Sequence, residues 1–351
     1  MKNNKISLAE VARAAGVSKM TASRVIRDEG GFSEKTRHKV MAEVDRLGYL
    51  PNRLATVFAG DKKSTFVGVS IPELGNEIFA QLLEGIDRKL VAFAHQTVLG
   101  MTEHALDQEE AWIETVLSWQ PAGLIVTGRS HSPRAMQLLK GAGIPIVEIW
   151  DFNSNPLDMC VGLNHFDSGY SMGRYLGELG YTKFGYVGTS HDTANAASSR
   201  LAGFTKAAED AGGTVKKKLL LKDVPGFYTG LYGTEQLLAA HKDVDVIFYQ
   251  NDNMAVGGYE YCRRQGLEIP RDIGIAGWGD LPIASIQPYR LTSIAVPHLR
   301  IGQIAAEMLL AQVNQHPIKR TRDVGFKLIP GSTCRMQLKT DIDEDIDHSK
   351  T

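Results

Sequence analysis

The start and stop signals of three short helices lie within the first fifty residues. Ser7 and Glu10 have the spacing of a capping box, in which a hydroxyl and a carboxylate bond to the free amides at a helix start. Apolar residues then recur at helical spacing as far as Gly16, which can leave a helix through positive φ. Ser18 can cap a second helix over residues 19–27, and a third helix fits residues 33–48. This pattern predicts a helix-turn-helix unit.

The second helix of such a unit enters the major groove of DNA by its N-terminal end. The side chains expected to contact DNA are Ser18, Lys19, Met20, Thr21, Ser23 and Arg24. Residues 1–63 carry 13 Lys and Arg against 7 Asp and Glu, whereas the remainder carries 26 against 33. A basic segment on an acidic body favours nucleic acid as the partner of that segment. The alternative is a solvated helix face on a basic segment without a partner.

From residue 65 onward, apolar runs alternate with helical segments. The runs at 66–71, 122–127, 144–149, 184–188, 244–249 and 273–277 are typical of parallel strands between helices. We therefore predict an α/β protein with a helix-turn-helix domain at 1–49, a hinge helix or linker at 50–62 and a doubly wound body at 63–338. The chain is expected to cross between two lobes near residues 162, 292 and 324. The acidic segment 339–351 is predicted to be a disordered tail.

The motifs of the first fifty residues resemble those of the lactose-repressor family. The matching segments are 8–12, 15–18, 21–26, 40–45, 47–49 and 51–52, and segments 19–21, 118–119 and 129–134 are similar to the gluconate and idonate regulator branch. The resemblance implies a two-lobed body like a periplasmic binding protein, and a homodimer or tetramer on a pseudo-palindromic operator in double-stranded DNA. It also implies DNA contacts from Asn52, Ala55 and Phe58, with Phe58 in place of the usual leucine wedge. Phe58 packed against the body is the alternative.

An effector site is expected at the carboxyl ends of the strands, in the cleft between the lobes. The resemblance implies effector contacts from Arg200, which offers a forked donor to a carboxylate or to hydroxyls, and from Asn251 and Asp252. Asp252 as the N-cap of the next helix is the alternative role. Gly279 stands where sugar-binding members commonly have Asp, which favours an anionic ligand. Further candidates are Arg129, His131, Trp150, Trp278, Asp280 and Phe79, with a surface role for Arg129 and His131 left open.

We therefore expect a repressor that a sugar acid such as gluconate releases from its operator. A neutral sugar or nucleoside as effector, and corepression, remain alternatives. An enzyme is disfavoured because Ser171, in a formal GxSxG pattern, falls inside a predicted helix. Cysteine and histidine spacings indicate no metal site, no nucleotide motif or other cofactor signal occurs, and no apolar run predicts a membrane span. A cytoplasmic location is expected, since no signal segment is seen.

Overall fold

The computed structural model describes residues 6–51, 64–152, 154–190, 196–222, 225–285 and 288–336. The chain divides into two compact units, residues 1–64 and 65–351. The expected DNA contacts from Asn52, Ala55 and Phe58, nearly all of the expected hinge and the acidic tail lie outside the described residues. Among the residues described, no helix is both long and apolar enough to cross a membrane.

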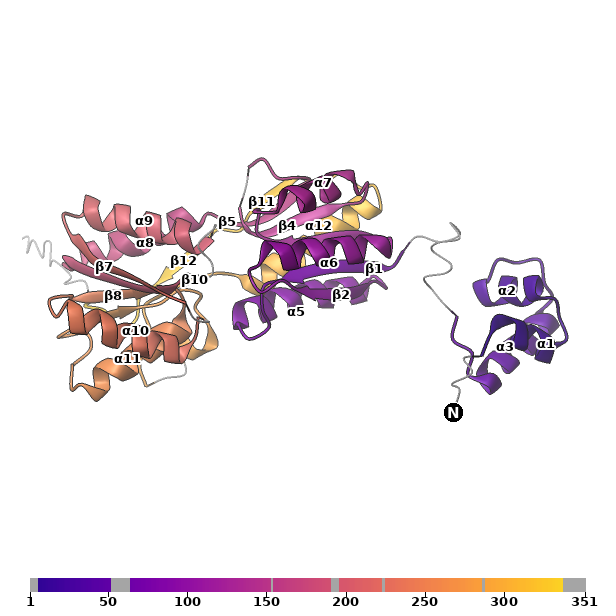
Figure 1. The fold of residues 1–351 in the computed structure, drawn as a ribbon, viewed down its shortest axis with the longest axis horizontal. Helices are drawn as coiled ribbons and strands as arrows, with labels where there is room; N and C mark the ends of the chain where they lie inside the picture. Colours follow the sequence, from indigo (N-terminus) through magenta and orange to yellow (C-terminus); the bar gives the residue numbers. More distant parts are fainter. Residues whose placement is uncertain are drawn as a thin grey trace, which may run out of the picture. The chain divides into compact units, whose positions relative to one another are not determined.

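The first unit is built from three helices, α1 (Leu8–Ala15), α2 (Lys19–Arg27) and α3 (Glu34–Leu47) (Figure 1). Both hydrogen bonds of the capping box between Ser7 and Glu10 are present at the start of α1. Gly16 ends that helix with φ +64°, a conformation that side chains with a Cβ rarely adopt. The three helices enclose a small apolar core of Val11, Ala12, Ala15, Ala22, Val25 and Val40. The predicted helix-turn-helix unit is confirmed.

The first lobe of the second unit is a parallel six-stranded sheet in the order β11-β5-β4-β3-β1-β2. Its strands are β1 (Phe66–Ile71), β2 (Gln96–Met101), β3 (Gly123–Thr127), β4 (Ile146–Asp151), β5 (Met159–Leu163) and β11 (Thr321–Asp323). Its helices are α5 (Glu77–Ala92), α6 (Leu106–Ser118), α7 (Pro133–Gly141) and α12 (His298–Val313). The central strands are buried on both faces, which explains their continuous apolar sequences.

The second lobe is a parallel four-stranded sheet in the order β7-β6-β8-β9. Its strands are β6 (Lys183–Thr189), β7 (Thr214–Leu221), β8 (Val246–Tyr249) and β9 (Gly274–Ala276). Its helices are α8 (His165–Glu178), α9 (Ala196–Asp210), α10 (Phe227–Ala240), α11 (Asp252–Arg264) and the 3-10 turn η1 (Pro282–Ala284). A short antiparallel ribbon pairs β10 (Ser293–Ala295) with β12 (Lys327–Ile329).

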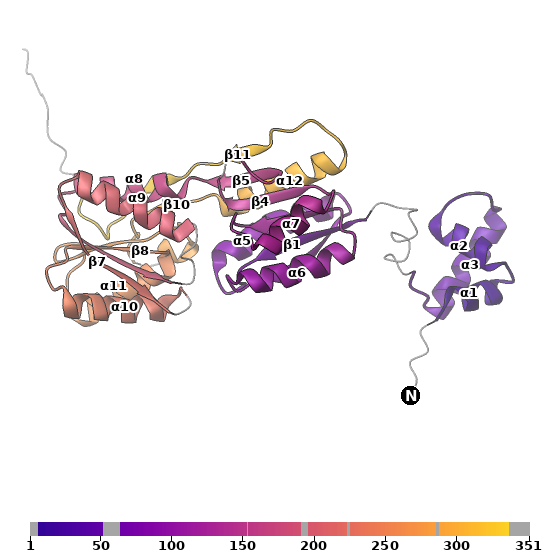
Figure 2. The same cartoon turned by 45° about the horizontal axis from the view of Figure 1, so that its top comes forward.

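The chain passes between the two lobes more than once. It leaves the first sheet after β5, returns after β10 to form α12 and β11, and then runs back to β12. Figures 1 and 2 show α12 and β11, from late in the chain, lying with the strands of the first lobe. The predicted α/β fold class, with its helical headpiece and two-lobed body, is confirmed.

Candidate functional site

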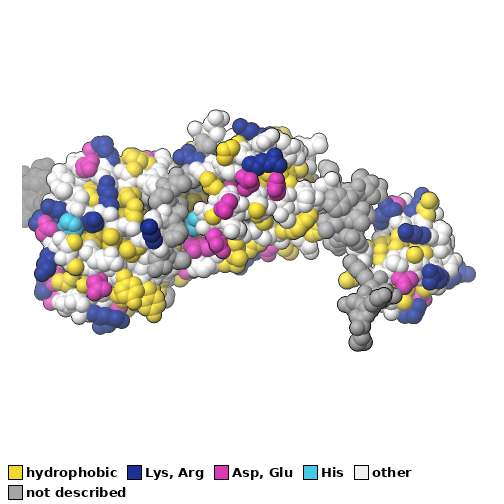
Figure 3. Space-filling model, viewed as in Figure 1, with side chains coloured by type: hydrophobic (Ala, Val, Ile, Leu, Met, Phe, Trp, Pro, Cys, Tyr) yellow, Lys and Arg dark blue, Asp and Glu magenta, His cyan; other side chains and the backbone are white. Residues whose placement is uncertain are grey.

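The exposed face of α2 carries the long side chains expected to reach DNA. Lys19, Met20 and Arg24 are exposed, and Met20 is 73% exposed although it is apolar. The Ser18 hydroxyl accepts a hydrogen bond from the Thr21 amide at 3.0 Å, so Ser18 is the N-cap of the helix. Lys and Arg side chains spread over the visible surface of the headpiece (Figure 3). A basic surface of this kind suits a phosphate backbone.

The Ser23 hydroxyl on α2 is occupied within the helix. It accepts a hydrogen bond from Arg27 Nε at 3.0 Å and another from Nη2 at 2.6 Å. Arg27 in turn lies 3.2 Å from Glu29. Ser23 is thus partly buried under Arg27, while Lys19, Met20 and Arg24 extend from the surface.

A pocket of about 120 Å³ lies at the carboxyl ends of strands β1 to β4. Residues from the first lobe form most of its wall, and Ala196, at the start of α9 in the second lobe, completes it. The lining residues are Pro72, Phe79, Thr102, His104, Ala105, Leu106, Glu109, Thr127, Gly128, Ser130, Trp150, Asp151 and Ala196. Apolar walls with a few polar groups at strand ends are typical of small-molecule sites in α/β proteins.

Trp150, which lines this pocket, is the centre of a buried aromatic cluster. Its ring centroid lies 5.8 Å from that of Phe79, 5.5 Å from that of Trp278 and 5.7 Å from that of His298. Trp150 has a φ of +88°, which is strained for a residue with a bulky side chain. Backbone strain of this kind is concentrated at functional sites.

Arg200 lies in α9, one helical turn beyond the pocket-lining Ala196, and is only 3% exposed. Its guanidinium carbon stands 4.0 Å from the centre of the Trp278 ring, in a cation–π arrangement. Its Nη1 donates a hydrogen bond to Nδ1 of His165 at 3.1 Å. Burial and the Arg200 charge lower the pKa of His165 well below its ordinary value. A buried arginine is thus held beside the aromatic cluster, with the neutral His165 and Trp278 among its partners.

Arg129 and His131 have acidic partners. Arg129 Nε lies 2.9 Å from Asp151 Oδ2, and the Arg129 side chain remains 44% exposed. The buried His131 ring lies with Nδ1 2.9 Å from Glu109 and Nε2 3.8 Å from Glu148. Burial opposes protonation of this ring, but the two glutamates outweigh it and raise the pKa of His131 to about 9. The ring of His131 therefore points at glutamates, whereas Arg129 stays at the surface beside a residue that lines the pocket.

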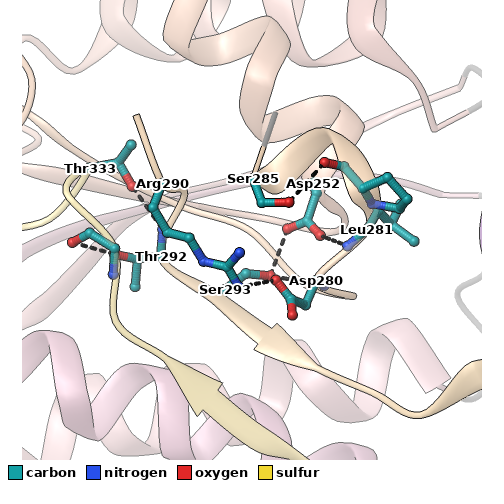
Figure 4. A network of polar contacts seen from close by, with 10 residues as sticks. Asp252, Asp280, Leu281, Ser285, Arg290, Thr292, Ser293 and Thr333 are labelled. Atoms are coloured by element: carbon teal, nitrogen blue, oxygen red, sulfur yellow. Dashed lines mark hydrogen bonds and ion pairs between the residues drawn. The ribbon is translucent and has the colours of Figure 1, made fainter. Parts of the chain in front are cut away.

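Asp252 is tied into the second lobe by hydrogen bonds (Figure 4). Its carboxyl accepts from the Ser293 hydroxyl at 2.6 Å and from the Leu281 amide at 2.7 Å. Burial raises the pKa of Asp252 to about 7, against the opposing effect of these two bonds. The alternative that Asp252 caps α11 is wrong, because the N-cap is Asn251, whose side chain accepts from the Met254 amide at 2.9 Å.

Asp280 belongs to the same network and has a partner of its own. Arg290 Nη2 donates to Asp280 Oδ1 at 2.7 Å, and the Asp280 amide donates to the Ser293 hydroxyl at 3.2 Å. Neither Asp280, Asn251 nor Asp252 is among the residues that line the pocket. These three residues organise the strand ends of the second lobe.

The structure brings four of the candidate residues together: Phe79, Trp150, Trp278 and Arg200. Sequence reasoning did not find His165 and His298, nor Thr102, His104 and Glu109 of the pocket wall. Thr102 follows β2. Because this strand was not predicted, the position of Thr102 at a strand end could not be predicted either. His165 directly follows the crossover expected near residue 162, and this position between the lobes is the sequence feature that could have pointed to it.

Two rival site chemistries find no support in the described geometry. Ser171 lies inside α8, away from any strand-to-helix turn. Over the described ranges, no group of three or more His, Cys, Asp or Glu side chains is arranged to hold a metal ion.

Comparison with protein families and curated proteins gives consistent results. Residues 7–52 match the lacI family of bacterial regulatory proteins, and residues 174–334 match a periplasmic binding protein-like domain. The chain is 34% identical to the HTH-type transcriptional regulator GntR of Escherichia coli K12, over 95% of this chain and all of that protein. It is 30% identical to the regulator IdnR of the same organism, again over 95% and 100%.

Solved structures agree with these sequence matches. A LacI-family transcriptional regulator from Silicibacter pomeroyi has a TM-score of 0.87 and 34% identity, covering 93% of this chain and 99% of that chain. The regulator GntR from Chromobacterium violaceum has a TM-score of 0.73 and 29% identity, covering 76% and 98%. With its helix-turn-helix unit, its two-lobed body and these full-length relatives, the chain belongs to the lacI family and is a DNA-binding transcriptional regulator.

Proposed function

We propose that this regulator is a repressor whose two-lobed unit binds a sugar acid such as gluconate, and that binding releases it from its operator. The observation that carries the proposal is the buried Arg200 beside the pocket at the strand ends. Arg200 and the pocket-lining Ala196 lie four residues apart and therefore on the same face of α9. A buried guanidinium at that place offers charge-assisted hydrogen bonds to a carboxylate.

The pocket wall supplies the remaining contacts that a polyhydroxy acid requires. Thr102, Thr127, Ser130 and Asp151 present polar groups that can bond to hydroxyls. Phe79 and Trp150 offer apolar ring surface to the carbon chain. The full-length similarity to the regulators GntR and IdnR adds support for an effector of the gluconate and idonate class.

A neutral sugar is the second candidate effector, and one observation favours it. Glu109 and Asp151 both line the pocket, so acidic groups face the ligand alongside polar ones. The ion pair between Arg129 and Asp151 offsets this for an anionic ligand, because it neutralises one of the two acidic groups. We favour the acid because two arginines, Arg129 and Arg200, stand near the pocket.

DNA binding by a homodimer completes the proposal. Two copies of α2, about 34 Å apart, would read the half-sites of a pseudo-palindromic operator through Lys19, Met20 and Arg24. Residues 50–62 would fold as a hinge on the operator, with Phe58 entering the minor groove. A ligand releases the protein only if it binds the two conformations with different affinity. The proposed domain boundaries are 1–49, 50–62 and 63–338, with the tail from 339.

The proposal is tested by thermal unfolding and calorimetry of the full chain with gluconate, idonate, glucose, ribose and a nucleoside. We expect the two acids to raise Tm and to bind with measurable heat, and the other three compounds to do neither. Stabilisation by glucose, ribose or the nucleoside alone would overturn the sugar-acid assignment. A response to none of the five compounds would overturn it as well.

A further inference from the structure

His165 of the second unit is a buried histidine that makes hydrogen bonds with residues of both lobes. It is the first residue of α8, is 1% exposed and lies between the effector arginine and the first lobe. One ring nitrogen, Nδ1, stands 3.1 Å from Arg200 Nη1, and the other, Nε2, stands 3.2 Å from the Trp150 carbonyl oxygen. A single side chain therefore bridges α9 of the second lobe and the end of β4 in the first.

The chemistry of the two partners fixes the state of this ring. A guanidinium can only donate hydrogen bonds, so Nδ1 of His165 must accept from Arg200. A carbonyl can only accept, so Nε2 must carry the proton and donate to Trp150. Only the neutral imidazole with its proton on Nε2 satisfies both contacts. A charged ring, or the other neutral form, would place two donors or two acceptors against each other.

The surroundings hold this arrangement rigidly. The Trp278 indole, which carries the Arg200 guanidinium on its face, donates through Nε1 to Ser168 Oγ at 3.3 Å. Ser168 lies on α8 three residues after His165 and donates to the His165 carbonyl at 2.8 Å. Helices α8 and α9 also pack so closely that a Cβ on Gly169 would lie 1.9 Å from the Arg200 carbonyl oxygen. The guanidinium is thus held at its edge by His165 and at its face by Trp278.

We propose that His165 is the positioning residue of the effector site. It orients the Arg200 guanidinium toward the effector and couples this guanidinium to the strained backbone at Trp150. This inference rests on the proposed function of the pocket. Trp150 both lines the pocket and gives its carbonyl to His165. A ligand that draws Arg200 toward itself changes the bond at Nδ1, and the bond at Nε2 transmits the change to β4 of the first lobe.

The first test compares two substitutions at His165 in the full chain. His165→Gln retains one acceptor and one donor, whereas His165→Phe retains the ring volume and neither polar group. For the Phe variant we expect gluconate to bind about ten- to a hundredfold more weakly, which is the range for a lost partner of a buried charged group. We expect operator affinity without gluconate to stay within about threefold of the parent, and the Gln variant to recover most of the gluconate affinity. His316→Gln, at an exposed position, is the control and should change neither.

The second test needs no ligand and is independent of the sugar-acid assignment. Nitrogen-15 NMR of histidine-labelled protein at pH 7 should show a neutral ring with its proton on Nε2, identified by its loss in His165→Gln. A ring protonated on Nδ1, or a charged ring, would overturn the proposal. So would equal gluconate responses in the parent and Phe variants, or equal defects in the Gln and Phe variants, which indicate packing alone. If the parent does not bind gluconate but binds another sugar, the effector assignment fails, and binding of that sugar is then compared between the parent and the two variants.

Discussion

The buried cluster of His131, Glu109 and Glu148 should make the two-lobed unit less stable as the pH rises into the alkaline range. The folded state raises the pKa of His131 from 6.5 to about 9, so protonated His131 favours the folded state. Its contribution is fully present below pH 6.5 and is lost as the pH rises through about 9. The difference between the two pKa values corresponds to about 3 kcal/mol of unfolding free energy.

Urea unfolding followed by tryptophan fluorescence measures this contribution. All four tryptophans, Trp112, Trp119, Trp150 and Trp278, lie in the second unit, so the signal reports that unit and not the headpiece. The parent and His131→Gln should be compared at pH 6, 7, 8, 9 and 10. We expect the stability advantage of the parent over the variant to shrink by about 3 kcal/mol across this range, most of it between pH 6.5 and 9.

His316→Gln is the matched control, because its ring is exposed and no pH-dependent difference from the parent is expected. The reasoning is refuted if the difference between the parent and His131→Gln is constant from pH 6 to pH 10. Such a result would mean that the pKa of His131 is the same in the folded and unfolded states, so that Glu109 and Glu148 do not favour its protonated form.

Three further predictions follow from the sites. Arg200→Ala should weaken gluconate binding by about ten- to a hundredfold in calorimetry, since a charge-assisted hydrogen bond is lost, while operator affinity in anisotropy stays within about threefold; loss of operator binding instead would contradict the site assignment. Lys19→Ala and Arg24→Ala should each weaken operator binding by about 1–3 kcal/mol if they contact bases, and an equal loss on unrelated DNA would show phosphate contacts instead. Gly169→Ala should lower the Tm of the second unit, because the added methyl would lie 1.9 Å from the Arg200 carbonyl oxygen. Gly141→Ala, the control, has open space around the added methyl and should not lower the Tm. Equal melting temperatures for the two variants would show that α8 and α9 can separate freely.

The headpiece could be predicted almost completely from the sequence, because its helix boundaries depend on local signals. Ser7, Ser18 and Ser33 each cap a helix, and Gly16 and Gly48 each end one with positive φ. Side chains close in the chain make these contacts, so their spacing is visible in the sequence. Helical periodicity then defined the core face.

Edge strands were among the parts of the fold that were not predicted from the sequence, and the buried interior strand β5 was another. Strand β7 lies at the edge of its sheet and carries three consecutive exposed lysines, Lys216, Lys217 and Lys218, so its apolar run is limited to the last three residues, 219–221. Strand β2 is also an edge strand, with only Gly100 buried among its residues. The lysines of β7 discourage pairing with other chains, and the exposure of both edge strands removes the signal by which a buried strand is found.

Candidate site residues could be named from the sequence, whereas the contacts that they make with residues distant in the chain could not. Arg200 was identified from its motif, but the bonds that position it come from His165, 35 residues away. His131 was expected as an effector contact, but the hydrogen bond between its Nδ1 and Glu109, 22 residues earlier, was not expected. Tertiary contacts of this kind leave no spacing in the sequence.

The most direct test of the central claim is a titration of operator binding. Labelled DNA from the promoter of the neighbouring genes is followed by fluorescence anisotropy with increasing protein, with and without saturating gluconate or glucose. We predict that gluconate raises the apparent Kd at least about tenfold, a coupling near 1.4 kcal/mol, and that glucose leaves it unchanged. Tighter binding in gluconate, or release by glucose and not by gluconate, would contradict it.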